Sequence, residues 1–367
     1  MIAIYSNNYS TDHYIQQLKF QQQHQVYQSA DQYVAVTADV KIAFVNHLNS
    51  YEPPESEQQR LQQVIGGHKF SQEIDQVKQC SDLVFAFDTE LHAYHQELFC
   101  RHNHPDVYWV VPGQINDPDA ADQQNVIVWN AHFDLLTWPY QTLTAPIQKL
   151  QHNTVKPLCF DALLGSPKPH RDFVYNSVMS HNLQHSSILT YMTDPTVNFQ
   201  TGLAWESDIQ QFPATATRPT DLVLYHEHNI ALARILPIEI YNQTAYSVVA
   251  ETGFHNWYSF FTEKTAKPMM AQRLFVMFSG QNFLHNLRSL GFRTFDNVID
   301  ESYDRIHNDQ ERWSAAFEQV QRLCSMDQTW VFDQITHTVE HNYQLLMTTN
   351  WTQHMLAQLQ QKLNHSI

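Results

Sequence analysis

A short stretch in the second half of the chain combines the side chain types that can hold a phosphate and a sugar ring. Its members are Glu251, Thr262, Glu263, Lys264 and Lys267. Thr262 is a favourable N-cap, so Glu263 and Lys264 are predicted to open a helix. The free N–H groups of a helix start attract phosphate, and a lysine there adds a full positive charge. Lys267 follows Lys264 at helical spacing, so both can face one side.

A carboxylate such as Glu251 or Glu263 can accept hydrogen bonds from ribose hydroxyls, so the whole set suits a nucleoside diphosphate. The alternative is a capped helix with solvated charges, because capping residues and surface charges are common. The functional interpretation is favoured by the neighbouring sequence. Glu251 ends the apolar run 245–250, and a second apolar run, 274–278, follows the helix.

From residue 245 to residue 280 the sequence resembles the donor-binding half of the α1,3-fucosyltransferases and their bacterial relatives. In that family a strand ending in Glu is followed by a Thr-Glu-Lys helix start and a second strand. The chain is more similar still to glycosyltransferase-like proteins of phages and marine bacteria. The runs that carry this similarity are 261–268, 287–296 and 299–304. The resemblance covers about residues 157–325. The fucosyltransferases have Glu-Asn-Ser where this chain has Glu251-Thr252-Gly253, which leaves the base and the sugar open.

The resemblance implies a GT-B architecture, in which two Rossmann-like domains face each other across a cleft and the nucleotide binds the C-terminal domain. It implies that Glu263 contacts the ribose and that Lys264 contacts the diphosphate. It also implies that Arg171 clamps the diphosphate, because the run 160–175 matches the opening strand, loop and helix of that domain. An arginine suits this task because its fork binds phosphate oxygens bidentately, although an isolated arginine is also a common surface residue.

A transfer that inverts the sugar needs a base for the acceptor hydroxyl, and in this architecture the N-terminal domain usually supplies it. Three candidates follow an apolar run of strand length: Asp88, Glu90 and His92. A residue at the end of such a strand should face a cleft. The alternative is a helix start with acidic capping residues. Glu52 and Asp134 are weaker candidates of the same kind.

Short apolar runs that alternate with helical stretches predict an α/β fold with parallel strands covered on both faces. The predicted strands are 2–5, 40–45, 83–87, 107–111, 126–129, 158–164, 187–191, 245–250 and 274–278. The predicted helices are 11–23, 57–63, 170–182, 263–271, 282–290, 311–324, 327–347 and 350–364. Residues 193–222 are predicted to be irregular, and the proline-containing segment 135–157 is predicted to be a linker.

Two successive series of strands and helices predict two domains followed by C-terminal helices. Residues 1–150 should form an acceptor-side Rossmann-like domain, and residues 151–330 a Rossmann-like domain that binds the nucleotide sugar. Residues 331–367 should form helices that pack back on the body of the protein.

The composition excludes several classes of protein. The formal net charge of −16 disfavours a general nucleic-acid or membrane-surface binder. Four widely spaced cysteines indicate reduced thiols in a cytoplasmic protein, and neither a signal peptide nor a membrane span is expected. Asp117-Pro118-Asp119 follows a polar loop and not an apolar strand, so it is interpreted as loop. The histidine pairs lack a third ligand at zinc spacing, so no metal site is predicted.

The predicted function is transfer of a hexose or pentose from a nucleoside-diphosphate donor to a hydroxyl, with a glycan acceptor favoured. A GDP-linked donor is favoured by the resemblance. No metal and no separate cofactor are expected, because Arg171, Lys264 and Lys267 can neutralise the leaving diphosphate. One alternative is a phage-type enzyme that glycosylates a hydroxymethylated base, with modified DNA as its partner. Another is a non-catalytic nucleotide-sugar-binding protein.

Overall fold

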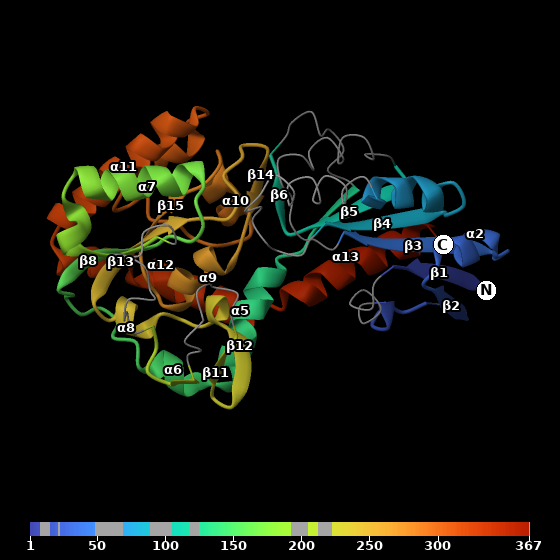
Figure 1. The fold of residues 1–367 in the computed structure, drawn as a ribbon, viewed down its shortest axis with the longest axis horizontal. Helices are drawn as coiled ribbons and strands as arrows, with labels where there is room; N and C mark the ends of the chain where they lie inside the picture. Colours follow the sequence, from blue (N-terminus) through green and yellow to red (C-terminus); the bar gives the residue numbers. More distant parts are fainter. Residues whose placement is uncertain are drawn as a thin grey trace. The chain divides into compact units, whose positions relative to one another are not determined.

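The computed structural model describes residues 1–7, 15–20, 23–47, 69–88, 105–116, 125–191, 205–211 and 222–366. The chain divides into two compact units, and the described residues form a mixed α/β protein with parallel sheets and C-terminal helices, compatible with a Rossmann-like fold (Figure 1). The first unit consists of Met1–Ala131 and Asn350–Ile367, and the second of His132–Thr349. The chain thus enters the second unit near residue 131 and not near residue 150, and the predicted segment 331–367 is divided between the two units.

The first unit is built on a six-stranded sheet with the order β2-β1-β3-β4-β5-β7. Every paired neighbour in it is parallel. The strands are β1 (Ile2–Ser6), β2 (His24–Tyr27), β3 (Val40–His47), β4 (Leu83–Asp88), β5 (Val107–Val111) and β7 (Val126–Val128). A further short strand, β6, spans Gly113–Ile115. Because the side chains of the inner strands alternate between two buried faces, these strands are apolar almost throughout.

Both faces of this sheet are covered by helices. The last helix, α13, spans Trp351–Ser366 (Figure 1). Its Met355, Leu359 and Leu363 belong to one core with Ile2, Ile4, Phe44 and Phe85. The other face is covered by α2 (Ala30–Ala35) and by a helix over residues 69–78. Phe70 of the latter packs edge-on against Trp109, with 6.0 Å between the ring centroids. A C-terminal helix therefore completes the core of the N-terminal unit.

The second unit contains a four-stranded parallel sheet with the order β15-β13-β8-β9. Its strands are β8 (Leu158–Leu163), β9 (Ser187–Thr190), β13 (Thr244–Ala250) and β15 (Phe275–Phe278). In Figure 1, α7 and α11 lie over one face, and α9 and α12 lie on the other. The helices are α7 (Pro169–Ser180), α8 (Ile238–Tyr241), α9 (Glu263–Met270), α10 (Phe283–Ser289), α11 (Asp309–Ser325) and α12 (Gln328–Thr348). Short 3₁₀ turns cover Leu183–Ser186, Leu232–Arg234 and Glu301–Arg305, and one more strand, β14, spans Tyr258–Phe260.

The predicted linker 135–157 is mostly helical, which corrects that prediction. It contains the end of α5 (Ala131–Thr142) and the whole of α6 (Thr144–Gln148). Pro146 lies in the first turn of α6, where a backbone N–H has no partner within the helix in any case, so the proline is tolerated. The helical conformation of α5 is explained by burial, because its inward face carries the fully buried Phe133 and Leu136.

A small antiparallel sheet accompanies the main sheet of the second unit, with the order β10-β11-β12. Its strands are β10 (Ile209–Gln211), β11 (Leu222–Tyr225) and β12 (His228–Ala231). β10 falls within the region predicted to be irregular. Tyr225 at the end of β11 is fully buried, so this sheet has a core of its own.

A buried ion pair joins three strands near the amino ends of β13 and β15. The Arg273 guanidinium, just before β15, donates to Asp161 Oδ1 on β8 at 2.9 Å and to the Thr244 carbonyl at 2.7 Å. Ser247 Oγ and Thr244 Oγ1 also donate to Asp161 Oδ1. These contacts lie at the edge of the sheet opposite to the carboxyl ends, so they fix strand alignment.

Two cysteines that were predicted to be reduced are paired. Cys159 on β8 and Cys324 on α11 form a disulfide, with 5.5 Å between their Cα atoms. Cys80 is a free thiol. Spacing along the chain could not reveal this pair, because the two positions are 165 residues apart and meet only when α11 packs on the sheet.

Candidate functional site

The strand order of the second unit reverses between β8 and β13. β8 lies between β9 and β13, so the connection that leaves β8 through α7 goes to one side and the later strands lie on the other. Ligands of open parallel sheets bind at the carboxyl ends of the strands beside such a reversal. Here that position lies between the loop 164–168, which leads from β8 into α7, and Glu251, which follows β13. Of the cofactor-binding residues predicted for this unit, Arg171 lies on α7, Glu251 follows β13, Thr262 precedes α9, and Glu263, Lys264 and Lys267 lie on α9.

Glu251 is fully buried, and its carboxylate is surrounded by hydrogen-bond donors. Oε1 accepts from the Thr262 N–H at 3.0 Å and from Thr265 Oγ1 at 2.6 Å. Oε2 accepts from the Thr252 N–H at 2.7 Å and from Thr262 Oγ1 at 2.6 Å. A ribose contact by Glu251, as predicted, would require breaking these bonds. In the structure Glu251 joins the end of β13 to the start of α9.

Thr262 is the N-cap of α9, as the sequence predicts. Its hydroxyl accepts a hydrogen bond from the Lys264 N–H at 3.2 Å, and α9 begins at Glu263. Thr262 is itself buried, with 1% of its surface exposed. The side chains that open the helix are therefore placed by a network whose centre is the Glu251 carboxylate.

Lys264 and Glu263 form an ion pair next to this network. The Lys264 ammonium donates to Glu263 Oε1 at 2.7 Å and to Thr252 Oγ1 at 3.0 Å. Glu263 Oε2 lies 3.9 Å from Nδ1 of His132, at the start of α5. Burial raises the pKa of the Glu263 carboxyl, but the charges of Lys264 and His132 outweigh it and hold the pKa at about 2. Glu263 is therefore an anion at neutral pH, and 16% of its side chain is exposed.

Two more cations, at the start of α7, contact the same strand end. The Lys168 ammonium donates to the Thr252 carbonyl at 2.7 Å. The Arg171 guanidinium donates to the Glu251 carbonyl at 3.2 Å and to the Ser166 carbonyl at 2.9 Å. These two bonds join the loop after β8 to the end of β13, and Arg171 is 2% exposed. The diphosphate contact that the resemblance implies for Arg171 stays a prediction. Three cations thus converge on Glu251-Thr252 from two helix starts.

His170, which precedes Arg171 on α7, is fully buried and neutral. Its Nε2 is 2.6 Å from the Glu251 carbonyl oxygen, which can only accept, so Nε2 carries the proton. Burial, together with the charges of Arg171 and Lys168, lowers the pKa of His170 well below its ordinary value. The ring stacks on Phe254, with 4.9 Å between the centroids. His170 therefore holds the strand end in place and does not add charge to it.

Lys267 is placed differently from Lys264. It is 7% exposed, and its ammonium lies over the ring of Trp205, 4.9 Å from the centroid. The pKa of Lys267 is lowered to about 7, mainly by burial. The charge of Glu263 opposes this shift, and the charge of Lys264 adds to it. Lys267 therefore lies beneath the surface in the last turn of α9, where it is only partly charged at neutral pH.

Most of the side chains predicted as the catalytic base lie outside the described residues. Asp88 ends β4, as predicted, but its side chain and the whole of Glu90 and His92 lie outside the described residues. Glu52 also lies outside them. Asp134 lies in the first turn of α5 and is half-buried. The catalytic roles of Asp88, Glu90 and His92 therefore stay predictions.

Sequence reasoning missed Lys168 and His132. Lys168 precedes Pro169, the first residue of α7, and a Lys-Pro pair after a strand and loop is a recognisable helix start. His132 had no comparable signal, because its approach to Glu263 depends on how α5 packs. Among the described residues, no group of three or more His, Cys, Asp or Glu side chains could hold a metal ion. No helix in the described ranges is both long and apolar enough to cross a membrane.

Comparison of the chain with protein-family models, with curated proteins and with solved structures finds no match.

Proposed function

We propose that the protein is a glycosyltransferase that binds a nucleoside-diphosphate sugar at the carboxyl ends of β8 and β13. The observation that carries the proposal is the convergence of Lys168, Arg171 and Lys264 on Glu251-Thr252, at the point where the strand order reverses. Parallel sheets bind nucleotides at this point, and positive charge beside helix starts suits a diphosphate. The resemblance of residues 245–280 to fucosyltransferase-like enzymes supports a sugar nucleotide, with a GDP-linked donor favoured.

In the proposed complex each group has a separate task. The Lys264 and Lys168 ammonium groups, which now donate to Thr252, turn to the diphosphate oxygens. Glu263, an anion with part of its carboxylate exposed, accepts hydrogen bonds from the ribose hydroxyls. Arg171 and Glu251 keep the loop after β8, the end of β13 and the start of α9 in register. The cations stabilise the leaving diphosphate, so no metal is required for its departure.

The proposal includes a GT-B arrangement. The first unit then supplies the acceptor site and the base, with Asp88, Glu90 and His92 as the candidates. A hydroxyl of a glycan is the proposed acceptor. The net charge of −16 makes DNA the less favoured acceptor, because its phosphates are repelled by an acidic protein.

The test is a panel of sugar nucleotides, with donor binding measured by calorimetry and donor hydrolysis or transfer by release of the nucleoside diphosphate. One donor of the panel should bind and turn over in the wild type. Lys264→Ala should weaken its binding by about 10- to 100-fold, because a hydrogen bond to a charged group contributes about 1.5–3 kcal/mol. Arg322→Ala is the matched control, since Arg322 lies in the last turn of α11.

Three outcomes separate the alternatives. Binding of a donor without any turnover identifies a non-catalytic nucleotide-sugar-binding protein. Equal binding and turnover in wild type and Lys264→Ala would show that the diphosphate does not bind at α9. Binding of no donor at all would contradict the proposal as a whole.

A further inference from the structure

β2 is the outermost strand of the six-stranded sheet of the first unit. Among the described residues it pairs only with β1, and each of its four residues is at least partly exposed. Sheet edges usually avoid pairing with other chains by carrying charges, proline or a bulge. His24-Gln25-Val26-Tyr27 contains neither a proline nor a residue with a full charge, and its register with β1 is unbroken. This edge therefore lacks the features that prevent strand addition.

The alternation of the backbone shows which groups point outward. The Ile2 N–H donates to the Gln23 carbonyl at 2.9 Å, so the main chain of residue 23 faces β1. Because the direction alternates along a parallel strand, Gln25 and Tyr27 also turn their main chain to β1. His24 and Val26 then point their N–H and C=O groups away from the sheet. No described residue pairs with these groups, so in this part of the structure the outer edge offers two donors and two acceptors at fixed spacing.

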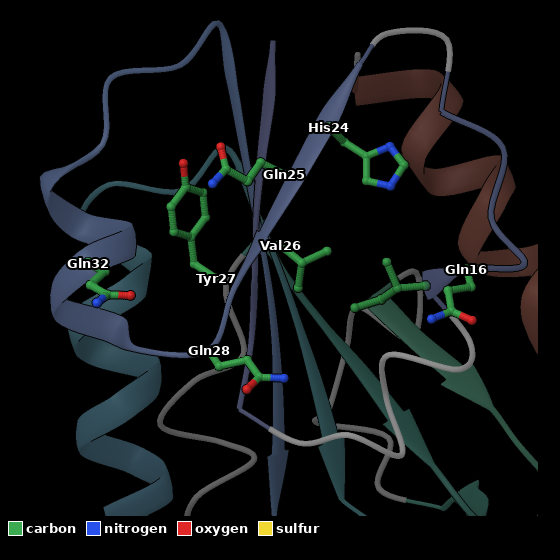
Figure 2. A pocket seen from close by; sticks show the side chains of 8 residues that line it. Gln16, His24, Gln25, Val26, Tyr27, Gln28 and Gln32 are labelled. Carbon is green, nitrogen blue, oxygen red and sulfur yellow. The ribbon is translucent and has the colours of Figure 1, made fainter.

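The residues of this edge line a hollow of about 500 Å³, and four of the eight residues that line it are glutamines (Figure 2). Gln25 lies on the strand, Gln28 follows it, and Gln16 and Gln32 lie on either side. An amide group donates and accepts hydrogen bonds, so a surface rich in glutamine is complementary to a copy of itself. The hollow is open around the strand and offers side-chain partners next to the free main chain.

Charge indicates which occupant fits. Residues 20–30 contain no Asp, Glu, Lys or Arg, although the chain as a whole carries a net charge of −16. Two copies of such an acidic chain repel each other over most of their surface. The repulsion is weakest where the contact surface itself is uncharged and self-complementary. A second copy of this chain meets that condition at the β2 edge.

We propose that β2 joins two copies of the chain in an antiparallel pair around a two-fold axis beside Gln25. In this register His24 exchanges backbone hydrogen bonds with the partner's Val26, and Val26 with the partner's His24. That gives about four backbone hydrogen bonds. Gln25 lies opposite the partner's Gln25, at the close spacing of a pair that is not hydrogen-bonded, so the two amides can bond to each other. The contact uses the same surface on both copies, so it closes at two subunits.

The test measures molar mass by light scattering and by sedimentation over a range of concentrations. The wild type should pass from one to two chains as concentration rises. Val26→Lys should weaken this association at least about tenfold, because it places two like charges at the edge. The control is Val155→Lys, the same substitution at a valine of the second unit that is 67% exposed. Val26 is 38% exposed, so its lysine variant should keep the melting temperature of the wild type.

A second variant addresses the hydrogen bonds directly. Val26→Pro removes an outward N–H and leaves the bonds between β2 and β1, so it too should prevent association while the fold is kept. A wild type that stays a single chain up to millimolar concentration would overturn the proposal, even if the edge accepts an unrelated extended peptide. Association that is as strong in Val26→Lys as in Val155→Lys would also overturn it.

Discussion

Both carboxylate oxygens of Glu251 accept hydrogen bonds from Thr262, one from its N–H at 3.0 Å and the other from its hydroxyl at 2.6 Å. A strand end and a helix start that are 11 residues apart are thereby held as one piece. The N-cap of α9 and the position of Lys264 depend on this contact. The stability of the strand end and the geometry of the proposed donor site should therefore change together when it is altered.

Replacing Glu251 by glutamine should destabilise the second unit. The amide group would turn two N–H donors toward the N–H and hydroxyl donors that now surround the carboxylate. We expect Glu251→Gln to lower the free energy of unfolding by about 1.5–3 kcal/mol, the contribution of a hydrogen bond to a charged group. Urea unfolding followed by far-ultraviolet circular dichroism measures it. Glu340→Gln, on the exposed side of α12, is the control. Equal stability of the two variants would show that Glu251 has no such role.

Lys267 should make stability depend on pH. Its pKa is about 7 in the folded protein and 10.5 when exposed, so between these values the unfolded chain binds more protons and stability rises with pH. Lys267→Met lacks this dependence. Its stability relative to the wild type should be highest below pH 7 and should fall by up to about 1.4 kcal/mol per pH unit as the pH rises. Urea unfolding between pH 6 and pH 10 tests this, and parallel curves would contradict it.

Gly280 should not tolerate a side chain. A Cβ atom there would lie 2.2 Å from the carbonyl oxygen of His255, and a backbone oxygen cannot move aside as a side chain can. We expect Gly280→Ala to cost about 1–3 kcal/mol, the usual effect of overpacking. Gly253→Ala is the milder comparison, because the nearest atom to its Cβ would be the Cβ of Phe260 at 3.2 Å. Thermal unfolding of both variants compares them, and a smaller effect at Gly280 would be inconsistent with this packing.

The Cys159–Cys324 disulfide should stabilise the second unit. Reduction, or replacement of Cys324 by serine, should lower the free energy of unfolding by about 2–4 kcal/mol. Mass spectrometry after alkylation under denaturing conditions identifies the bond, and melting with and without reductant measures its effect. Cys80→Ser is the matched control, since Cys80 is a free thiol. Alkylation of both Cys159 and Cys324 without prior reduction would rule out the bond.

The sequence was sufficient to predict most of the main strands and helices of the described residues. Each predicted strand has a counterpart, because a buried parallel strand is an unmistakable apolar run. The start of α9 was predicted correctly because the capping preference of Thr262 is local. β2 was not predicted, because its exposed residues show no apolar pattern. The predicted helix 57–63 lies outside the described residues. Of the predicted helix 11–23, residues 15–20 and 23 are described, and among these Ile15 is helical and the residues after it are not.

The composition of the candidate site could be predicted only in part. Lys264 and Glu263 are neighbours in sequence, so their joint position followed from the helix start. The contact between Lys168 and Thr252 joins residues 84 positions apart, and it exists because β8 and β13 are adjacent in the sheet. Strand order cannot be derived from local pattern, and it decides which loops meet. The burial of Glu251 likewise depends on which elements meet. The sequence predicted a ligand contact for Glu251, whereas in the structure its carboxylate is the centre of a hydrogen-bond network.

The return of α13 to the first unit has a consequence for how the protein is made. Met355, Leu359 and Leu363 belong to the core around β1, β3 and β4, yet the ribosome adds them only after the whole of the second unit. During synthesis one apolar face of the N-terminal sheet lacks the side chains of α13 until residues 351–366 have been made. The second unit, which lies wholly between the two parts of the first, can fold before the first is complete. Shortening the C-terminus should therefore harm the N-terminal half of the protein first.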